Sequence, residues 1–145
     1  MKTADVIIVG SGAAGLFNAL FLPQDYKVIV ITKKTVEESD SFLAQGGISA
    51  LKNPEDYDSY FEDTMKAGHY ENDKGAVEKM IKESPQIIQD LKDFGVRFDL
   101  KDGEIEFTRE GGHSTFRILH HEDLTGKEIT SHLYEEAKKR DNITI

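Results

Sequence analysis

The chain has 145 residues, which suits a single domain that buries roughly 70% of the surface its unfolded form would expose. Its 27 acidic residues outnumber its 18 basic ones and give a formal charge of −9, which argues against nucleic-acid and anionic-membrane partners. The absence of cysteine excludes disulfides and thiolate-bound metals.

The N-terminal third predicts a strand–helix–strand unit. Asp5–Gly10 ("DVIIVG") is a continuous apolar run, typical of a strand buried on both faces. A glycine-containing turn leads into an apolar helix that Pro23 ends. Tyr26–Thr32 ("YKVIVIT") resembles the first strand in pattern. This order within about 30 residues predicts a right-handed βαβ unit with parallel strands.

Residues 53–95 predict a helical excursion from this unit. Asn53, just before a proline, suits the N-cap of a first helix, and Gly68 suits its C-cap. A second helix starts at Asp73, and Ser84-Pro85 is expected to interrupt and restart it before Gly95 ends it. The tyrosines of the first helix recur at helical spacing, so we expect them in the core and not as a stacking platform.

Residues 96–145 predict a hairpin, a loop, a long helix and a last strand. Asp102-Gly103 lies between alternating residues and is a strong hairpin signal. The amphipathic segment Thr125–Arg140 predicts a helix that leads to a strand returning to the sheet. The predicted fold class is α/β: one incomplete domain made of residues 1–52, 53–95 and 96–145.

The sequence contains neither a membrane-length apolar segment nor a signal-peptide pattern. We therefore expect a cytoplasmic protein. The chain ends on "DNITI", which reads as the beginning of a strand and favours a fragment of a longer protein.

A G-x-G-x-x-G sequence lies between the first predicted strand and helix. Its first glycine permits a tight turn, its second lets a pyrophosphate approach the backbone, and its third lets helix and strand pack closely. The phosphate is expected at the free N–H groups of the helix N-terminus. The pattern predicts a dinucleotide-binding loop of Gly10, Ser11, Gly12, Ala13, Ala14 and Gly15.

The acidic residue that commonly follows the second strand and binds a ribose is missing here. Thr32, Lys33 and Lys34 occupy this region instead. Lys33 could meet the 2′-phosphate of NADP or the adenosine part of FAD, or the lysines could simply extend into solvent. The local residues leave these alternatives open.

Three segments in order, "VIIVGSGAAG", "ITKK" and "SFLAQGGISA", resemble the succinate dehydrogenase/fumarate reductase flavoprotein family. The resemblance implies a Rossmann-like FAD-binding domain. Members that bind flavin covalently use a histidine where this chain has Asp40, so the resemblance implies non-covalent FAD. The segment that it implies around FAD consists of Asp40, Ser41, Phe42, Leu43, Ala44, Gln45, Gly46 and Gly47.

The segment "FTREGGHSTFRILHHEDLTG" resembles the L-aspartate oxidase branch of this family, which has an acid where succinate- and fumarate-acting relatives have an uncharged loop. The resemblance gives Glu110 the role of orienting substrate through its ammonium group. A carboxylate would repel a simple diacid, whereas an amino diacid offers it a charge-assisted hydrogen bond. The alternative is a solvated ion pair of Glu110 with Arg109 or Arg117.

The implied activity is FAD-dependent oxidation of L-aspartate to iminoaspartate, with reoxidation by oxygen or fumarate, as the first step of quinolinate and NAD synthesis. The implied partners are L-aspartate and quinolinate synthase. In this family the capping and C-terminal helical domains would follow residue 145. We therefore expect the chain alone to be inactive and to bind FAD poorly.

Three other functional interpretations remain open at this stage. The first is a succinate dehydrogenase or fumarate reductase type of flavoprotein subunit. The second is an NADP-dependent dehydrogenase, and the third is a non-catalytic nucleotide-binding module.

The histidines do not predict a metal site, because their spacing matches no zinc motif. Adjacent His120 and His121 would face opposite sides of a strand. His113 is expected near substrate or flavin.

Overall fold

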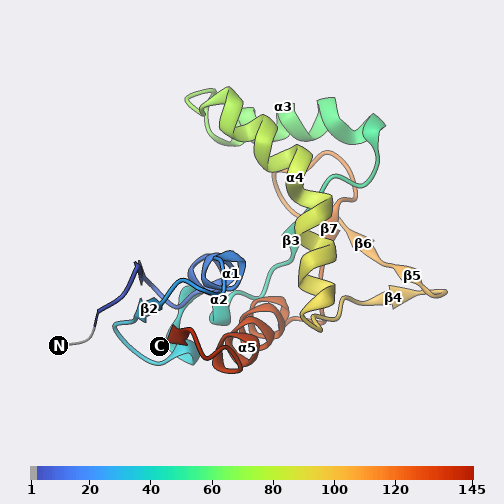
Figure 1. Cartoon of the computed structure of the whole chain (residues 1–145). Helices are drawn as coiled ribbons and strands as arrows, with labels where there is room; N and C mark the ends of the chain where they lie inside the picture. Colours follow the sequence, from blue (N-terminus) through green and yellow to red (C-terminus); the bar gives the residue numbers. More distant parts are fainter. Residues whose placement is uncertain (1–2) are drawn as a thin grey trace. The chain divides into compact units, whose positions relative to one another are not determined.

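The computed structural model describes residues 3–145, which fold into two compact units. The first, here called the sheet unit, comprises the chain up to Gly46, Phe94–Val96 and Asp123–Ile145. The second, the helical unit, comprises Gly47–Asp93 and Arg97–Glu122. Figure 1 shows the elements of each unit along the chain.

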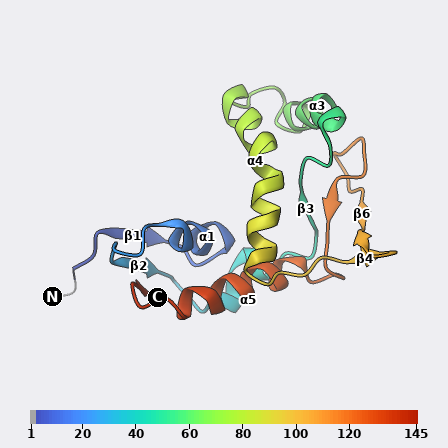
Figure 2. The same cartoon turned by 45° about the vertical axis from the view of Figure 1, so that its right-hand side comes forward.

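The sheet unit is built on three parallel strands in the order β1-β2-β8. They are β1 (Val6–Val9), β2 (Val28–Ile31) and β8 (Ile143–Thr144). Helix α1 (Ala13–Phe21) connects β1 to β2, which run side by side in Figure 2. The predicted βαβ unit and the return of the last strand to the sheet are both confirmed.

Helices α1 and α5 (Thr125–Lys138) pack together and supply most of the apolar core of this unit. The core residues include Leu16, Ala19, Val28, Val30, Leu133 and Ala137, none more than 2% exposed. Three phenylalanines cluster beside this core, with Phe21 53% exposed. Phe17 stacks on Phe21 with ring centroids 4.5 Å apart, and Phe94 meets Phe21 edge-on at 5.9 Å. Such aromatic pairs add stability beyond the area they bury.

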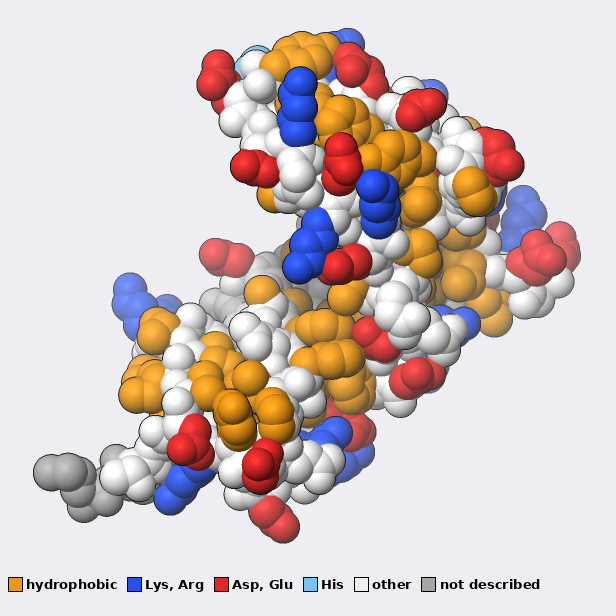
Figure 3. Space-filling model, turned by 45° about the horizontal axis from the view of Figure 1, so that its top comes forward, with side chains coloured by type: hydrophobic (Ala, Val, Ile, Leu, Met, Phe, Trp, Pro, Cys, Tyr) orange, Lys and Arg blue, Asp and Glu red, His pale blue; other side chains and the backbone are white. Residues whose placement is uncertain are grey.

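The prediction that the first strand is buried on both faces is wrong. Val6 and Ile8 are half-buried, whereas Ile7 is 61% and Val9 84% exposed, and Ile31 of β2 is 50% exposed. Alternate residues of a strand face opposite sides of a sheet, and the described residues cover one side only. Hydrophobic side chains therefore remain at the surface, as Figure 3 shows.

The helical unit begins as the sequence predicts. Asn53 Oδ1 accepts a hydrogen bond of 3.1 Å from Asp56 N and caps a short 3₁₀ helix (Pro54–Asp56), which continues into α3 (Tyr57–Ala67). Gly68 is the C-cap of α3. Tyr60 is 2% exposed and packs in a cluster with Met65, Val77 and Ile81, which confirms its place in the core.

The second helix is not interrupted at Ser84-Pro85: α4 runs unbroken from Lys74 to Asp93. Pro85 has no N–H to offer the carbonyl of Ile81 one turn earlier. The hydroxyl of buried Ser84 takes that role and donates to Ile81 O at 2.7 Å. The hydroxyl oxygen of Ser84 in turn accepts from Leu51 N at 2.9 Å. The serine therefore satisfies the carbonyl that proline leaves without a donor, and the helix continues.

Short antiparallel strands complete the helical unit. Strands β3 (Ile48–Ser49), β7 (Ile118–Leu119) and β6 (Phe107–Thr108) form a sheet in that order. Strands β4 (Leu100–Lys101) and β5 (Glu104–Ile105) form the predicted hairpin. Its turn residues Asp102 and Gly103 have φ angles of 55° and 86°, as a two-residue hairpin turn of this kind requires.

None of the helices among the described residues combines the length and the apolar character needed to span a membrane.

Replacing Ser84 with alanine should lower the free energy of unfolding by about 1–3 kcal/mol, because Ile81 O and Leu51 N both lose their partner. Adding Pro85→Ala restores an N–H to the helix, so the double variant should recover part of the loss. Urea denaturation of the whole protein measures both changes. Glu83→Ala, exposed on the same helix, is the control and should cost less than about 0.5 kcal/mol. If Ser84→Ala alone were as stable as the parent, this role of the hydroxyl would be contradicted.

Candidate functional site

The glycine turn between β1 and α1 has the geometry that the motif predicts. Gly10 has a φ of +112°, which L side chains rarely adopt. A Cβ on Gly15 would lie 2.0 Å from Gly10 O, so helix and turn approach too closely for any side chain there. Gly12 is the N-cap of α1 and provides no side-chain cap, which leaves first-turn N–H groups free for an anion.

A cavity of about 520 Å³ opens at this turn. It brings together three parts of the sheet unit: the glycine turn, the end of β2 and the start of α2 (Asp40–Leu43). Six of the predicted cofactor residues line it: Gly10, Ser11, Gly12, Lys33, Asp40 and Ser41. The predicted residues Ala13, Ala14, Gly15, Phe42, Leu43, Ala44, Gln45, Gly46 and Gly47 are not among the lining residues.

The end of β2 is joined to the glycine turn by hydroxyl groups. Buried Ser11 donates to Thr32 Oγ1 at 2.7 Å, and Thr32 donates to the carbonyl of Lys34 at 2.8 Å. The ammonium of Lys34 pairs with Glu38 at 2.9 Å. Within residues 3–145 no ion pair is found for Lys33, so its exposed charge remains available to a ligand. From the sequence, Thr32 and Lys34 were placed in this region without a role in the site, and Thr35, Glu38 and Ser39 were not singled out; all five also line the cavity.

Helix α2 is held against α5 by a glycine that the sequence did not single out. A Cβ on Gly126 would lie 2.1 Å from Ser41 O and 2.6 Å from Ala44 O. Gly126 N also donates to Ala44 O at 3.0 Å. At its other end α2 is capped by Ser39, whose Oγ accepts from Phe42 N at 3.2 Å. The start of α5 thus fixes the backbone of the segment predicted to lie around FAD.

Glu110 and Gly47, predicted to act on substrate and flavin, meet in the helical unit. Gly47 N donates to Glu110 Oε1 at 3.1 Å. A Cβ on Gly47 would lie 2.3 Å from Leu119 O, so only glycine fits this close to β7. Glu110 itself is exposed and pairs with neither Arg109 nor Arg117, so the alternative of a surface ion pair is wrong.

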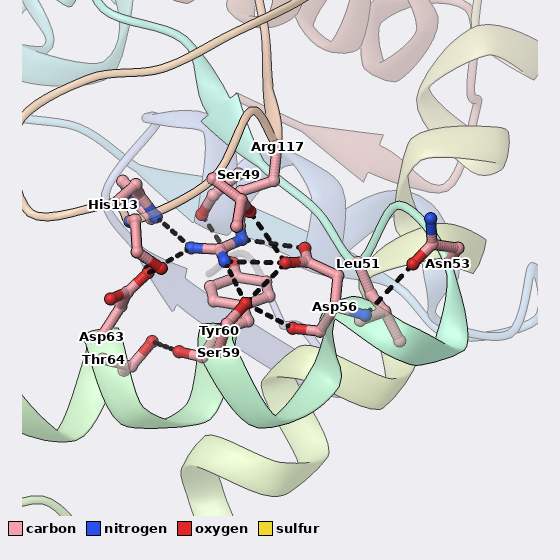
Figure 4. Close-up of polar contacts among 12 residues, drawn as sticks. Ser49, Leu51, Asn53, Asp56, Ser59, Tyr60, Asp63, Thr64, His113 and Arg117 are labelled. Atoms are coloured by element: carbon pink, nitrogen blue, oxygen red, sulfur yellow. Dashed lines mark hydrogen bonds and ion pairs between the residues drawn. The ribbon is translucent and has the colours of Figure 1, made fainter.

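Arg117 is instead fully buried in a cluster of polar side chains, shown in Figure 4. Its Nε and Nη2 donate to the two carboxylate oxygens of Asp56 at 2.9 and 2.7 Å. Its Nη1 donates to Asp63 Oδ2 at 2.6 Å. The guanidinium also lies 4.8 Å above the ring centroid of Tyr60. Two carboxylates and an aromatic face therefore compensate the burial of this charge.

The same carboxylates hold the loop that follows Glu110. Asp63 Oδ2 accepts from both the N–H and the hydroxyl of Ser114, at 2.7 and 2.8 Å. Asp56 Oδ1 accepts from the hydroxyl of Thr115 at 2.8 Å. Arg117 Nη1 lies 3.0 Å from His113 Nδ1. Three consecutive loop residues are thereby tied to α3 and to the buried arginine.

The cluster favours the charged forms of its members. Hydrogen bonding from Arg117 is the main cause that lowers the pKa of Asp56 from 3.8 to about 2. Burial acts to raise the pKa of Asp63, but hydrogen bonds from Ser114 and Arg117 outweigh it, and that pKa is also lowered. The hydrogen bond to Asp56 is the main cause that raises the pKa of Arg117.

The prediction that His120 and His121 face opposite ways is wrong. Strand β7 ends at Leu119, so strand alternation does not extend to either histidine. Both Nδ1 atoms lie near the carboxylate of Asp99, at 3.1 and 3.3 Å. In the part of the chain that the structure describes, no group of three side chains is suited to hold a metal ion.

Comparisons with known proteins agree on one family. The family described as "FAD binding domain" matches residues 5–145. The L-aspartate oxidase of Clostridium perfringens is 44% identical over 99% of this chain, and that of Clostridium acetobutylicum is 47% identical over 97%. The chain covers 33% of each of these proteins, so it spans about a third of their length.

Solved structures show the same relationship at lower identity. Escherichia coli quinol fumarate reductase FrdA matches with a TM-score of 0.90 and 26% identity, over 97% of this chain and 25% of that one. Mycobacterium smegmatis Sdh1 matches with a TM-score of 0.85 and 30% identity, over 99% of this chain and 27% of that one. The predicted relationship to the succinate dehydrogenase/fumarate reductase flavoproteins is confirmed.

Gly126→Ala should weaken FAD binding at least about 10-fold, because the added methyl overpacks α2 against Ser41 O and shifts the cofactor segment. Titration of the apo form of the whole protein with FAD measures the affinity. Gly111→Ala is the matched control, since a Cβ there meets no atom within 4 Å, and its FAD affinity should match that of the parent. Equal affinity of both variants would show that α2 tolerates the displacement.

Asp56→Asn should remove stability in a pH-dependent way. The pKa of Asp56 in the folded protein is about 2, below its ordinary value of 3.8. The carboxylate therefore contributes about 2 kcal/mol above pH 4, and this contribution is lost as pH falls through about 2. Urea unfolding of parent and variant between pH 2 and 7 should show their difference shrinking toward acid. The control is Asp58→Asn, at an exposed position on α3. A stability difference between parent and Asp56→Asn that stays constant with pH would contradict the assignment.

Proposed function

The chain belongs to the family of FAD binding domains, and from this premise we propose that it is the N-terminal part of an enzyme that oxidises L-aspartate to iminoaspartate. Its cofactor is FAD. The relatives named L-aspartate oxidase support the choice of substrate. The FAD assignment removes the NADP-dependent dehydrogenase from the alternatives.

The residues at the glycine turn fit FAD. The uncapped first turn of α1 offers N–H groups to the pyrophosphate, and Gly10 and Gly12 add no side chain that would block its approach. Lys33, whose exposed charge is available at the end of β2, is proposed to contact the adenosine part. Asp40 stands where covalent relatives have histidine, and a carboxylate cannot form that bond, so we propose non-covalent binding.

The reaction removes a hydride from the α-carbon of aspartate and a proton from its amine, which leaves a C=N bond. FAD, when bound, would supply the hydride acceptor, and oxygen or fumarate is the proposed final electron acceptor. The task of this chain is to hold the substrate in place. We assign Glu110 to the substrate ammonium, for which its carboxylate is a charge-assisted acceptor.

The observation that carries this proposal is the hydrogen bond from Gly47 N to Glu110 Oε1. It fixes one oxygen of an exposed carboxylate on a backbone segment that cannot shift toward β7. The second oxygen is left to a ligand, and the fixed negative charge favours an ammonium group over a second carboxylate. Such a site distinguishes an amino diacid from a simple diacid by charge.

The remaining groups of the reaction are proposed to lie outside this chain. The relatives are about three times as long, which leaves room for a capping domain, for the groups that move protons and for most of those that bind carboxylates. On this basis we propose that the chain alone is inactive. From the resemblance to the L-aspartate oxidases we also propose that the whole protein works in the cytoplasm and that its product passes to quinolinate synthase.

A succinate- or fumarate-acting flavoprotein is the second candidate, favoured by the close structural match to fumarate reductase. Fold similarity is shared by both candidates and does not choose between them. The charge of Glu110 does choose between them, because L-aspartate has an ammonium group for the carboxylate to attract and succinate has none.

Glu110→Gln should lower kcat/KM for L-aspartate about 5- to 100-fold, since the amide no longer offers a charge to the ammonium. Succinate, which lacks an ammonium, should bind at least as well to the variant as to the parent protein. Steady-state kinetics with L-aspartate and inhibition by succinate measure the two effects. Glu104→Gln, exposed in the hairpin, is the matched control and should change neither. An unchanged preference between the two diacids would falsify the assignment of Glu110.

A further inference from the structure

We propose that His113 is a second substrate-binding residue, which donates a hydrogen bond from Nε2 to a substrate carboxylate, and that Arg117 prepares it by fixing its tautomer. This inference rests on the proposed function, because it places His113 beside Glu110 in the same site. His113 binds a carboxylate of the substrate, whereas Glu110 binds its ammonium group.

Glu110 and His113 are the two ends of one tight turn. His113 N donates to the carbonyl of Glu110 at 3.2 Å across Gly111 and Gly112. Gly112 has a φ of +86°, which glycine adopts without strain. A Cβ on either glycine would meet no atom within 4 Å, so the turn is open on this side. The backbones of an acidic residue and a histidine are thus held together by one turn.

The contact with Arg117 determines which nitrogen of His113 carries the proton. Arg117 Nη1 lies 3.0 Å from His113 Nδ1, and a guanidinium has donors only. Nδ1 must therefore accept, which places the proton of the ring on Nε2. Figure 4 shows the two side chains directed toward one another. The buried arginine thus makes His113 a donor at its other nitrogen.

Arg117 cannot easily turn away from this contact. Asp56 holds two of its nitrogens and Asp63 a third, while Tyr60 covers its face. The ring of His113 also meets Tyr60, with centroids 6.0 Å apart and planes at 62°. The imidazole is therefore oriented before any ligand arrives, which reduces the entropy lost on binding.

The Nε2–H of His113 has no hydrogen-bond partner within residues 3–145, and His113 is one of the residues that line a hollow of about 480 Å³. Asp63 also lines the hollow, and its Oδ2 accepts from three donors: the N–H and the hydroxyl of Ser114 and Nη1 of Arg117. Lys66, a cationic residue, also lines the hollow. Donors and a positive charge suit a carboxylate ligand. The lining residues are Asp63, Lys66, Ala67, His69, Gly112, His113 and Ser114.

An α-amino diacid matches the two ends of the turn. Its ammonium needs a negative acceptor, which Glu110 provides, and a carboxylate needs a donor, which His113 provides. Aspartate and succinate share the carboxylate but not the ammonium. Loss of the His113 donor should therefore weaken both diacids, whereas loss of the Glu110 charge should weaken only aspartate.

The test compares His113→Leu, which removes the donor, with His113→Gln, which can accept from Arg117 and still donate with its amide. In the whole FAD-containing enzyme, His113→Leu should raise KM for L-aspartate and the inhibition constant for succinate about 10- to 100-fold. His113→Gln should stay within about 3-fold of the parent. Bound FAD absorbance should be the same in both variants.

Three results would overturn the inference: unchanged constants in His113→Leu, an equal loss in both variants, or a loss confined to L-aspartate. The last would leave the proposed function standing, because Glu110→Gln tests that separately. If His113→Leu fails to bind FAD, the ¹⁵N resonances of His113 in the parent enzyme decide. A protonated Nε2 that shifts on addition of succinate supports the proposal, and a protonated Nδ1 or an unmoved Nε2 contradicts it.

Discussion

The buried pairing of Arg117 with Asp56 and Asp63 is the interaction on which the helical unit depends. A guanidinium with no exposed surface is tolerable only where carboxylates surround it, and both acids here come from the stretch that begins α3. Arg117 directly follows the loop after β6. The ion pairs that neutralise its charge therefore also determine where that loop lies. A loop with two adjacent glycines would lose much conformational entropy on being ordered. Hydrogen bonds to charged groups offset that cost, and they give Glu110 and His113 defined positions.

The elements of the sheet unit are held in place by a different kind of interaction. The ion pair found at its cofactor cavity among the described residues, Lys34 with Glu38, is exposed. The elements around the cavity are fixed by backbones that approach too closely for any side chain. Gly15 lets α1 meet the turn after β1, and Gly126 lets α5 meet the segment that starts at Asp40. Such contacts leave the cavity lined by N–H groups and hydroxyls, which suits a cofactor with a pyrophosphate. Close backbone contacts thus position the cofactor cavity of one unit, and a buried ion-pair cluster positions the loop of the other.

The sequence predicted what short-range signals determine and missed what distant residues decide. The cap at Asn53 and the hairpin at Asp102 each depend on neighbours within a few positions, and both are confirmed. Arg117 was weighed as a partner of Glu110 because the two are close in sequence, whereas its actual partners lie more than 50 residues away. The helix continues past Pro85 for a similar reason: the serine that repairs it is held by a distant backbone N–H. Family resemblance supplied FAD, which spacing alone left undecided.

The uncovered side of the three-stranded sheet has a practical consequence for handling the protein. Ile7, Val9 and Ile31 present an apolar strip to water on strands that are otherwise well ordered. Contiguous apolar surface on a sheet is a common origin of self-association. A preparation of residues 1–145 alone should therefore become more soluble when Ile7, Val9 and Ile31 are replaced by polar residues. None of the three lines the cofactor cavity at the glycine turn, so that cavity should stay unchanged.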